Sequence, residues 1–154
     1  MGEPLFREHG RQVAALCWRT QSSGLVEVLL ITSLNSKRWI IPKGWPEDSA
    51  SFAVSAAREA FEEAGVTGEI GDTPLGSYHY LKEKKDGSGM PCMVEIFGLK
   101  ITGQAEDWPE KGTRELAWLS PEQASVRISE PGLRSILRTF HKTQTAARPR
   151  RRAG

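Results

Sequence analysis

The chain has 154 residues, of which 38% are hydrophobic and 26% are charged, and its formal net charge is +2. These values are typical of one globular domain, and they exclude a collagen, a long coiled coil and a fully disordered chain. The longest aliphatic run, Val28 to Ile31, is far too short for a membrane span. With only Cys17 and Cys92 and no apolar leader segment, we expect reduced thiols, a cytoplasmic location and no membrane association.

The charge is distributed unevenly along the chain. Residues 142–154 contain five basic side chains and no acidic one, whereas residues 1–141 carry a net charge of −3. We therefore predict one domain over residues 1–141, followed by a basic, disordered tail over residues 142–154. A solubilising role is the expected function of this tail, and contact with RNA is the alternative.

Short apolar runs alternate along the domain with segments of helical spacing. Strands are predicted over residues 12–19, 25–32, 39–41, 66–70, 75–85, 90–102 and 115–119. Helices are predicted over residues 51–64, from residue 121 onwards and over residues 131–145, with a loop at 43–46 and a hairpin turn at 86–89. Strands interspersed with helices in this order predict a layered α/β or α+β domain.

Capping residues mark the ends of two of these helices. Asp48 or Ser49 is the expected N-cap of the helix over residues 51–64, and Gly65 is placed to end it. Ser120 and Gln123 form a capping box, with proline at the first helical position, for the short second helix.

The helix over residues 51–64 has two different faces. Glu59, Glu62 and Glu63 fall within one arc of about 100° on a helical wheel, and alanines fill most of the opposite arc. A solvated face is the simple alternative, but like charges at this spacing cost about 0.2–0.5 kcal/mol per pair. They also lie where the helix dipole disfavours negative charge. This cost favours a site for a hard cation, with Mg²⁺ as the natural ion and Mn²⁺ as the alternative.

The loop before this helix carries groups suited to a phosphorylated ligand. Gly44 allows the backbone to approach a ligand closely, and Arg38 and Lys43 flank it with positive charge. The helix N-terminus adds a field that favours anions. We interpret Arg38 and Lys43 as substrate-binding residues in a site for phosphoryl-transfer chemistry, in which metal-bound carboxylates lie beside basic phosphate clamps.

In order and spacing, these residues resemble the box of the Nudix hydrolase family, G-x5-E-x7-R-E-U-x-E-E-x-G-U, where U is aliphatic. The residues in register are Gly44, Arg58, Glu59, Ala60, Glu62, Glu63, Gly65 and Val66. The departure is Ala50, which stands where the box has its first glutamate. The resemblance implies an α/β/α sandwich around a mixed sheet, and Mg²⁺-dependent hydrolysis of a diphosphate linked to another moiety.

The resemblance also implies roles for single residues. Glu59, Glu62 and Glu63 resemble the metal-binding, catalytic glutamates. Gly44 resembles the loop glycine whose carbonyl completes the metal coordination. Arg58 resembles the structural arginine that orients the acidic side chains.

The general base of the reaction is not fixed by the resemblance. The open candidates are two box glutamates and two acids from a later loop: Glu62, Glu63, Glu110 and Glu115.

Ala50 lies about nine residues from Glu59, which is more than about 13 Å along a helix. A glutamate there would be poorly placed to share a compact metal site with Glu59. We interpret the departure as the loss of a structural support, which Glu47 or Asp48 replaces, and we expect an active enzyme.

Motifs outside the box, at residues 12–15, 39–46, 108–112 and 117–119, resemble the bacterial branch near diphosphoinositol-polyphosphate and diadenosine-polyphosphate hydrolases. This resemblance implies a highly phosphorylated substrate. Further phosphate-binding candidates are Lys82, Lys84, Lys85 and Arg114, although lysines on a hairpin are more often a solvated strand edge. We expect at most one of four tryptophans to stack on a nucleobase of the substrate: Trp39, Trp45, Trp108 or Trp118.

The sequence thus predicts a Mg²⁺-dependent hydrolase of a diphosphate linkage in a nucleoside- or inositol-polyphosphate type of substrate. The partner is a phosphorylated small molecule, and we expect a monomer or a homodimer. One alternative is a catalytically weak Nudix-fold binding or regulatory module. Another is an RNA 5′-end pyrophosphohydrolase that uses the basic tail.

Overall fold

The fold is built on a mixed β-sheet. The computed structural model describes residues 10–147, and the side chains of residues 10–140. The strands in this part of the chain are β1 (Arg11–Thr20), β2 (Val26–Thr32), β3 (Trp39–Ile40), β4 (Lys43–Gly44), β5 (Val66–Ile70), β6 (Gly76–Glu83), β7 (Gly89–Gln104) and β8 (Leu116–Leu119). Their order is β3-β2-β1-β7-β5, with β4 paired to β1, β6 to β7 and β8 to β2. β1 and β7 pair in parallel, and the other neighbours are antiparallel.

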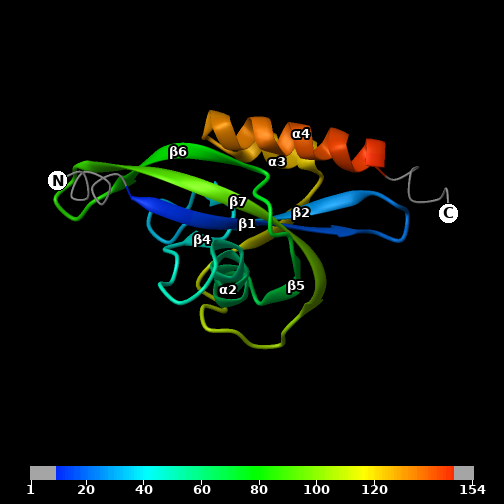
Figure 1. Ribbon diagram of the computed structural model, residues 1–154, viewed down its shortest axis with the longest axis horizontal. Coiled ribbons are helices and arrows are strands. Elements are labelled where there is room, and N and C mark those ends of the chain that lie inside the picture. The colour runs from blue at the N-terminus through cyan, green and yellow to red at the C-terminus, as the bar shows by residue number, and fades with distance from the viewer. Residues whose placement is uncertain (1–9, 148–154) are drawn as a thin grey trace.

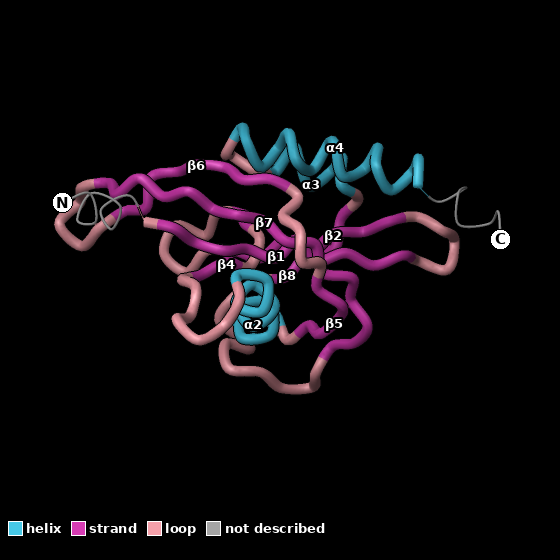
Figure 2. Tube along the Cα trace, viewed as in Figure 1, coloured by secondary structure: helices cyan, strands magenta, loops and turns pink. Residues whose placement is uncertain are grey.

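Helices cover both faces of this sheet. α2 (Phe52–Ala64) lies on one face, and α3 (Pro121–Arg127) and α4 (Pro131–Ala147) lie on the other, as Figures 1 and 2 show. The sheet is therefore the middle of three layers, which confirms the predicted α/β/α sandwich.

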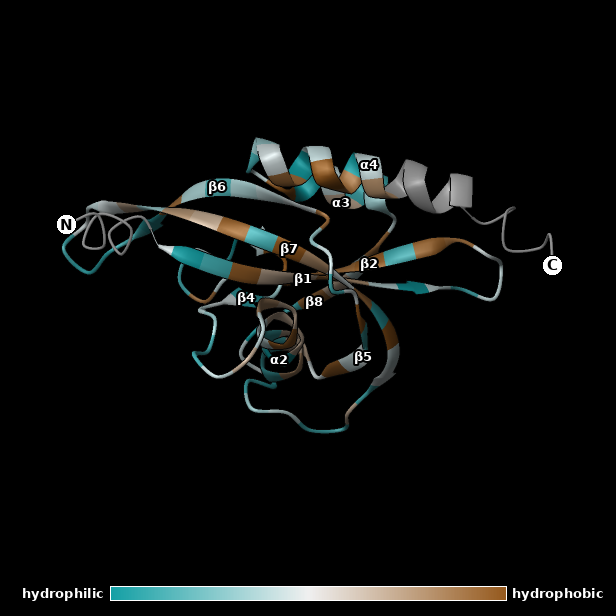
Figure 3. Ribbon diagram, viewed as in Figure 1, coloured by the Kyte–Doolittle hydropathy of each residue, from teal (hydrophilic) through white to brown (hydrophobic). Residues whose placement is uncertain are grey.

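β1 shows why the sheet needs a helical layer on each side. Val13, Ala15 and Cys17 pack with α2, while the alternate residues Ala14 and Leu16 pack with α3 and α4. Successive side chains of a strand point to opposite faces, so an uninterrupted apolar strand must be covered twice. All five side chains are fully buried. Figure 3 shows the hydrophobic stretches of β1, β2 and β7 between the two helical layers.

The predicted N-cap of α2 was wrong. Ser51 caps the helix, because its backbone is extended and its hydroxyl accepts the N–H of Val54 at 3.1 Å. The predicted loop at residues 43–46 also differs, since Lys43 and Gly44 form β4. Their backbone pairs with Ala14 and Val13 of β1, a pairing that local sequence does not specify.

The predicted end of α2 at Gly65 is confirmed. Gly65 has a positive φ of 74°, and its N–H donates to the carbonyl of Phe61 at 2.9 Å. The ring of Trp108 occupies the space where a Cβ would project, so Gly65 also admits close packing from the loop that follows β7.

α4 continues to Ala147, so residues 142–147 of the predicted basic tail are helical. The remaining tail residues, 148–154, lie outside the described residues. No helix in the described part of the chain has the length and apolar character needed to cross a membrane.

Candidate functional site

The candidate site lies where β4 meets the acidic face of α2. The pairing of Gly44 with Val13 holds this loop on the sheet. The carboxylate of Glu59 lies so close to the Cα of Gly44 that an added Cβ would overlap it. Glycine is therefore needed at position 44 for this close approach.

Glu63 is the buried carboxylate of the acidic face, with a relative exposure of 6%. One oxygen accepts the backbone N–H of Lys43 at 3.3 Å, and the other lies 3.4 Å from Nη2 of Arg114. Burial raises the pKa of Glu63 to about 8, with Arg114 opposing the rise and Glu59 and Glu110 adding to it. The ionised form of Glu63 is therefore disfavoured in the folded protein, and a positive charge beside the carboxylate would favour it.

Glu59 and Glu62 differ in their surroundings. Burial, followed by the nearby Glu62, raises the pKa of Glu59. Glu62 is more exposed, and its carboxylate accepts Nε of Arg58 at 3.0 Å. Arg58 also forms an ion pair with Glu47 in the loop before α2. This arginine thus ties the acidic face to the loop, and Glu47, of the two acids considered as a replacement for the missing box glutamate, is the one that contacts Arg58.

A loop that precedes β8 closes the acidic face from the other side. The N–H of Glu110 donates to the carbonyl of Glu62 at 3.1 Å. Arg114, with a side-chain exposure of 7%, donates to Glu110 at 2.8 Å and to the carbonyl of Thr32 at 3.0 Å. Glu115 is exposed. Of the two loop acids considered as a general base, Glu110 therefore lies beside the α2 carboxylates.

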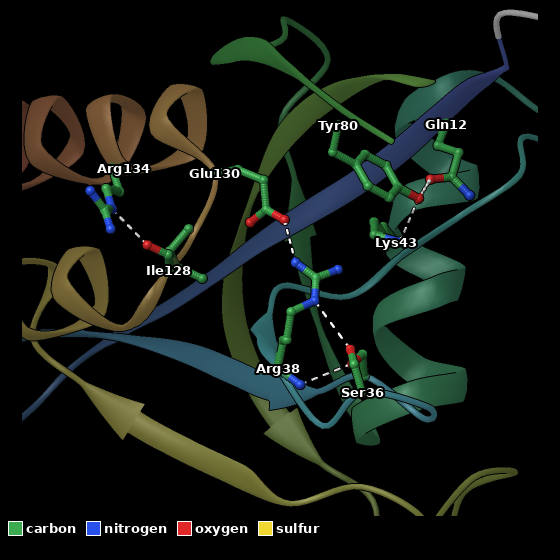
Figure 4. A network of polar contacts seen from close by, with 9 residues as sticks. Gln12, Ser36, Arg38, Lys43, Tyr80, Ile128, Glu130 and Arg134 are labelled. Carbon is green, nitrogen blue, oxygen red and sulfur yellow. Dashed lines mark hydrogen bonds and ion pairs between the residues drawn. The ribbon is translucent and has the colours of Figure 1, made fainter. Parts of the chain in front are cut away.

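Lys43 is held by a short hydrogen-bond chain, which Figure 4 shows. Its ammonium group donates to the hydroxyl of Tyr80 at 2.9 Å, and this hydroxyl donates to the side-chain oxygen of Gln12 at 2.6 Å. The ammonium also lies 4.6 Å from the centre of the Tyr80 ring. Burial, and then the positive charge of Lys82, lowers the pKa of Lys43 to about 8.

Arg38 is fixed by contacts with two different parts of the fold (Figure 4). Its guanidinium donates to Ser36 at 3.1 Å and to Glu130, in the connection between α3 and α4, at 2.7 Å. Much of its positive charge is therefore already balanced by a carboxylate.

These groups surround a pocket of about 650 Å³. Among the predicted site residues, those that line it are Arg38, Lys43, Gly44, Glu59 and Glu63. Arg58 and Glu62 lie outside the lining and contact each other. Of the further phosphate-binding candidates, Lys82 and Arg114 line the pocket, and Lys84 and Lys85 do not.

Sequence reasoning missed Gln12 and Tyr80, which also line the pocket. Strand alternation places Tyr78 and Tyr80 on one face of β6, but nothing in the local sequence shows which one faces a ligand. Tyr78 is buried at 3% exposure in the core with α4, whereas Tyr80 lies further along the strand, beside Lys43.

The carboxylates do not form a ready-made metal cage. Within residues 10–140, no three His, Cys, Asp or Glu side chains are grouped so that they could hold a metal ion. The physical reason is that Glu62 faces Arg58 and Glu63 faces Arg114. The donors still fit Mg²⁺ in chemical type, because they are carboxylate oxygens and two of them are destabilised by burial.

Comparison with known proteins decides the family. The model of the NUDIX domain matches residues 9–140. This chain belongs to the Nudix family. Nudix hydrolase 12, mitochondrial, of Arabidopsis thaliana is 38% identical over 102 residues, which are 64% of this chain and 50% of that protein. Diphosphoinositol polyphosphate phosphohydrolase 3-beta of Bos taurus is 32% identical over 117 residues, which are 74% of this chain and 66% of that protein.

The Nudix chain described here thus spans about half the length of the Arabidopsis protein. Solved structures share its fold. A binary complex of C. elegans Ap4A hydrolase has a TM-score of 0.65 at 21% identity, covering 89% of this chain and 98% of that one. The NUDIX domain of Shewanella oneidensis NrtR, complexed with ADP ribose, has a TM-score of 0.65 at 15% identity, covering 92% of both chains. At these identities the likeness shows the fold alone.

Proposed function

We propose that this Nudix protein hydrolyses a diphosphate linkage in a nucleoside- or inositol-polyphosphate type of substrate, with Mg²⁺ or Mn²⁺ as its cofactor. The observation that carries the proposal is the pocket in which the α2 carboxylates lie beside basic side chains. A relative named as a diphosphoinositol polyphosphate phosphohydrolase and a structural neighbour named as an Ap4A hydrolase support the substrate type.

In this proposal, Glu59, Glu62 and Glu63 would hold the metal ion, together with the carbonyl of Gly44, once their carboxylates turn toward it from the arginines that they face. The ion, when bound, neutralises charge on the phosphate oxygens and lowers the pKa of water. Arg58 orients Glu62, since it joins that carboxylate to Glu47. Glu62, Glu63 and Glu110 remain candidates for the general base, and Glu110 is the better of the two loop acids because it lies beside α2.

Basic side chains bind the phosphates of the substrate in this proposal. Lys43 is oriented by Tyr80, and with a pKa of about 8 it is mostly protonated at neutral pH. Arg38 and Arg114 line the same pocket and are held by carboxylates, so they offer fixed donors.

A turnover screen tests the proposal. The full chain is incubated with dinucleoside polyphosphates, inositol pyrophosphates, nucleotide sugars and nucleoside triphosphates, each with Mg²⁺, with Mn²⁺ and with EDTA. We expect phosphate-containing products with the metals, none with EDTA, and almost none from Glu63→Gln. Binding of these compounds without any turnover would instead support a binding or regulatory module.

The RNA 5′-end alternative is tested by a truncation. Removing residues 148–154 takes away four arginines and leaves α4 whole. If the protein acts on RNA through this tail, RNA affinity and its salt dependence should both fall. We expect no effect of the truncation on small-molecule turnover.

We also propose a cytoplasmic protein that is a monomer or a homodimer.

A further inference from the structure

Trp45 differs from the other tryptophans of the chain. In the described part of the chain, the rings of the other four each lie below a basic side chain, with the cation 3.6–5.9 Å from the ring centre: Trp18 below Lys100, Trp39 below Arg127, Trp108 below Lys111 and Trp118 below Arg19. No described cation covers Trp45, and its relative exposure is 45%. Among these tryptophans, Trp45 alone lines the pocket.

The ring of Trp45 is held in place although it is exposed. Its backbone follows β4, which is paired with β1. The edge of its six-membered ring rests on Gly10, where an added Cβ would lie only 2.8 Å and 2.9 Å from two ring carbons. Gly10 is buried, so the indole is anchored at one edge, and the 45% relative exposure of Trp45 leaves part of its surface open to solvent. A fixed aromatic surface of this kind binds a flat ligand at low cost in conformational entropy.

Two further apolar side chains accompany Trp45 at the pocket. Leu34, in the loop between β2 and β3, is 52% exposed, and Leu81, on β6, is 68% exposed. Both line the same pocket as Trp45, so three separate segments place exposed apolar side chains around a site that also holds basic groups. A ligand made only of phosphates and hydroxyl groups would leave this apolar surface unused.

The basic groups of the pocket suit a short phosphate chain. Arg38 is already paired with Glu130 at 2.7 Å, and Arg114 with Glu110 at 2.8 Å. Of the basic side chains that line the pocket, Lys43 and Lys82 form no ion pair with a described residue. The lining also includes Glu59, Glu63 and Glu83, so its net positive charge is small for a ring that carries a phosphate on every carbon.

We propose that Trp45, in a pocket that Leu34 and Leu81 also line, stacks on a nucleobase of the substrate. The site then takes nucleoside polyphosphates in preference to inositol pyrophosphates. This inference rests on the proposed function, because it assigns the substrate of the same pocket.

Direct binding tests the platform with two probes that are not hydrolysed. Adenosine 5′-(α,β-methylene)diphosphate carries a base, and methylene diphosphonate carries the phosphorus groups alone. Calorimetric titrations with Mg²⁺ should show wild type binding the nucleotide about tenfold or more tightly than the diphosphonate, as expected for base stacking on an aromatic ring. Trp45→Leu should lose this advantage and keep the same diphosphonate affinity, whereas Trp45→Phe should keep most of it.

Leu25→Ala is the matched control, because Leu25 is 64% exposed and does not line the pocket. It should leave both affinities unchanged, and melting temperatures show whether each variant is folded. Equal affinity of wild type for the two probes would overturn the proposal. So would an equal weakening of both probes by Trp45→Leu, since that would indicate a structural role.

These experiments distinguish a failure of base stacking by Trp45 from a failure of the proposed hydrolysis. A Trp45-dependent preference for the nucleotide, without turnover of any compound, would overturn hydrolysis and keep the platform. Faster turnover of inositol pyrophosphates than of dinucleoside polyphosphates, unchanged in Trp45→Leu, would keep hydrolysis and overturn the platform.

Discussion

Glu62 and Glu63 are neighbours in the sequence and lie in opposite environments. The side chain of Glu62 is 32% exposed and faces Arg58, while that of Glu63 is 8% exposed and faces Arg114. One residue of helix rotation, about 100°, accounts for the difference, because it turns the second carboxylate from solvent toward β4. Both carboxylates are expected to bind the metal ion, and each forms an ion pair with a different arginine.

Glu62→Gln and Glu63→Gln should each lower turnover by orders of magnitude and leave the protein folded. The amide keeps the shape of the side chain but removes the charge that a divalent cation needs. Steady-state kinetics on the best substrate of the screen, with melting curves beside them, measure both effects. Turnover equal to that of wild type in both variants would contradict the metal-site assignment.

Stability without metal should depend on the protonation of Glu63. Its pKa in the folded protein, about 8, lies above the ordinary value of 4.5, so the folded state holds this proton more tightly than the unfolded chain does. The contribution of protonated Glu63 to the free energy of unfolding is therefore fully present below pH 4.5 and is lost as the pH rises through 8. Urea unfolding in EDTA should show wild-type stability falling across this window. Glu63→Gln should reduce this decrease in the free energy of unfolding with pH. An unchanged pH dependence in the variant would contradict the burial argument.

The loop before α2 and the helix itself are joined by Arg58. The side chains of Arg58 and Glu47 are 49% and 44% exposed, so their ion pair is worth little for stability, at most about 1 kcal/mol. Its expected role is to set the position of Glu62.

Arg58→Ala should therefore lower the free energy of unfolding by about 1 kcal/mol or less, and lower turnover by a larger factor. Glu47→Gln should reproduce part of the loss in turnover, and the double variant should lose less than the sum of the two. Urea unfolding and kinetics on the four proteins test this. A rise in KM alone, with no change in kcat or stability, would instead make Arg58 a direct substrate clamp.

Ala50 lies just before the N-cap Ser51, in a turn where its N–H donates to the carbonyl of Glu47 at 3.3 Å. Ala50→Glu should raise stability by about 0.3–1 kcal/mol, because a negative charge near a helix N-terminus is favourable. Turnover should change by less than about tenfold, which corresponds to 1.4 kcal/mol in the barrier. An inert wild type that this substitution switches on would favour the regulatory-module reading.

At the scale of the whole molecule, the sandwich assembles the site from four separate segments. α2, β4, β6 and the loop before β8 contribute Glu63, Lys43, Tyr80 and Arg114 in turn. Metal bound by the carboxylates of α2 and by β4 in the folded state should stabilise the entire domain.

Mg²⁺ should therefore raise the melting temperature of wild type, and EDTA should reverse the rise. Glu62→Gln and Glu63→Gln should show a smaller rise, because each loses a ligand charge, and Leu25→Ala should respond as wild type does. Thermal scans over a range of Mg²⁺ concentrations give the comparison. An identical rise in all four proteins would mean that the ion acts elsewhere.

The sequence by itself determined the acidic box and the elements apart from β4 and the N-cap of α2. Apolar spacing, Gly65 and the Ser120 capping box predicted the helices and strands because these signals act between residues that are close in the chain. The tertiary structure decided which distant groups meet. Lys43 and Tyr80 are 37 positions apart, and Tyr80 and Gln12 are 68 apart. Their contacts, and the exposure that separates Trp45 from the other tryptophans, depend on strand pairing and layer packing, which hydrophobic spacing along one segment does not encode.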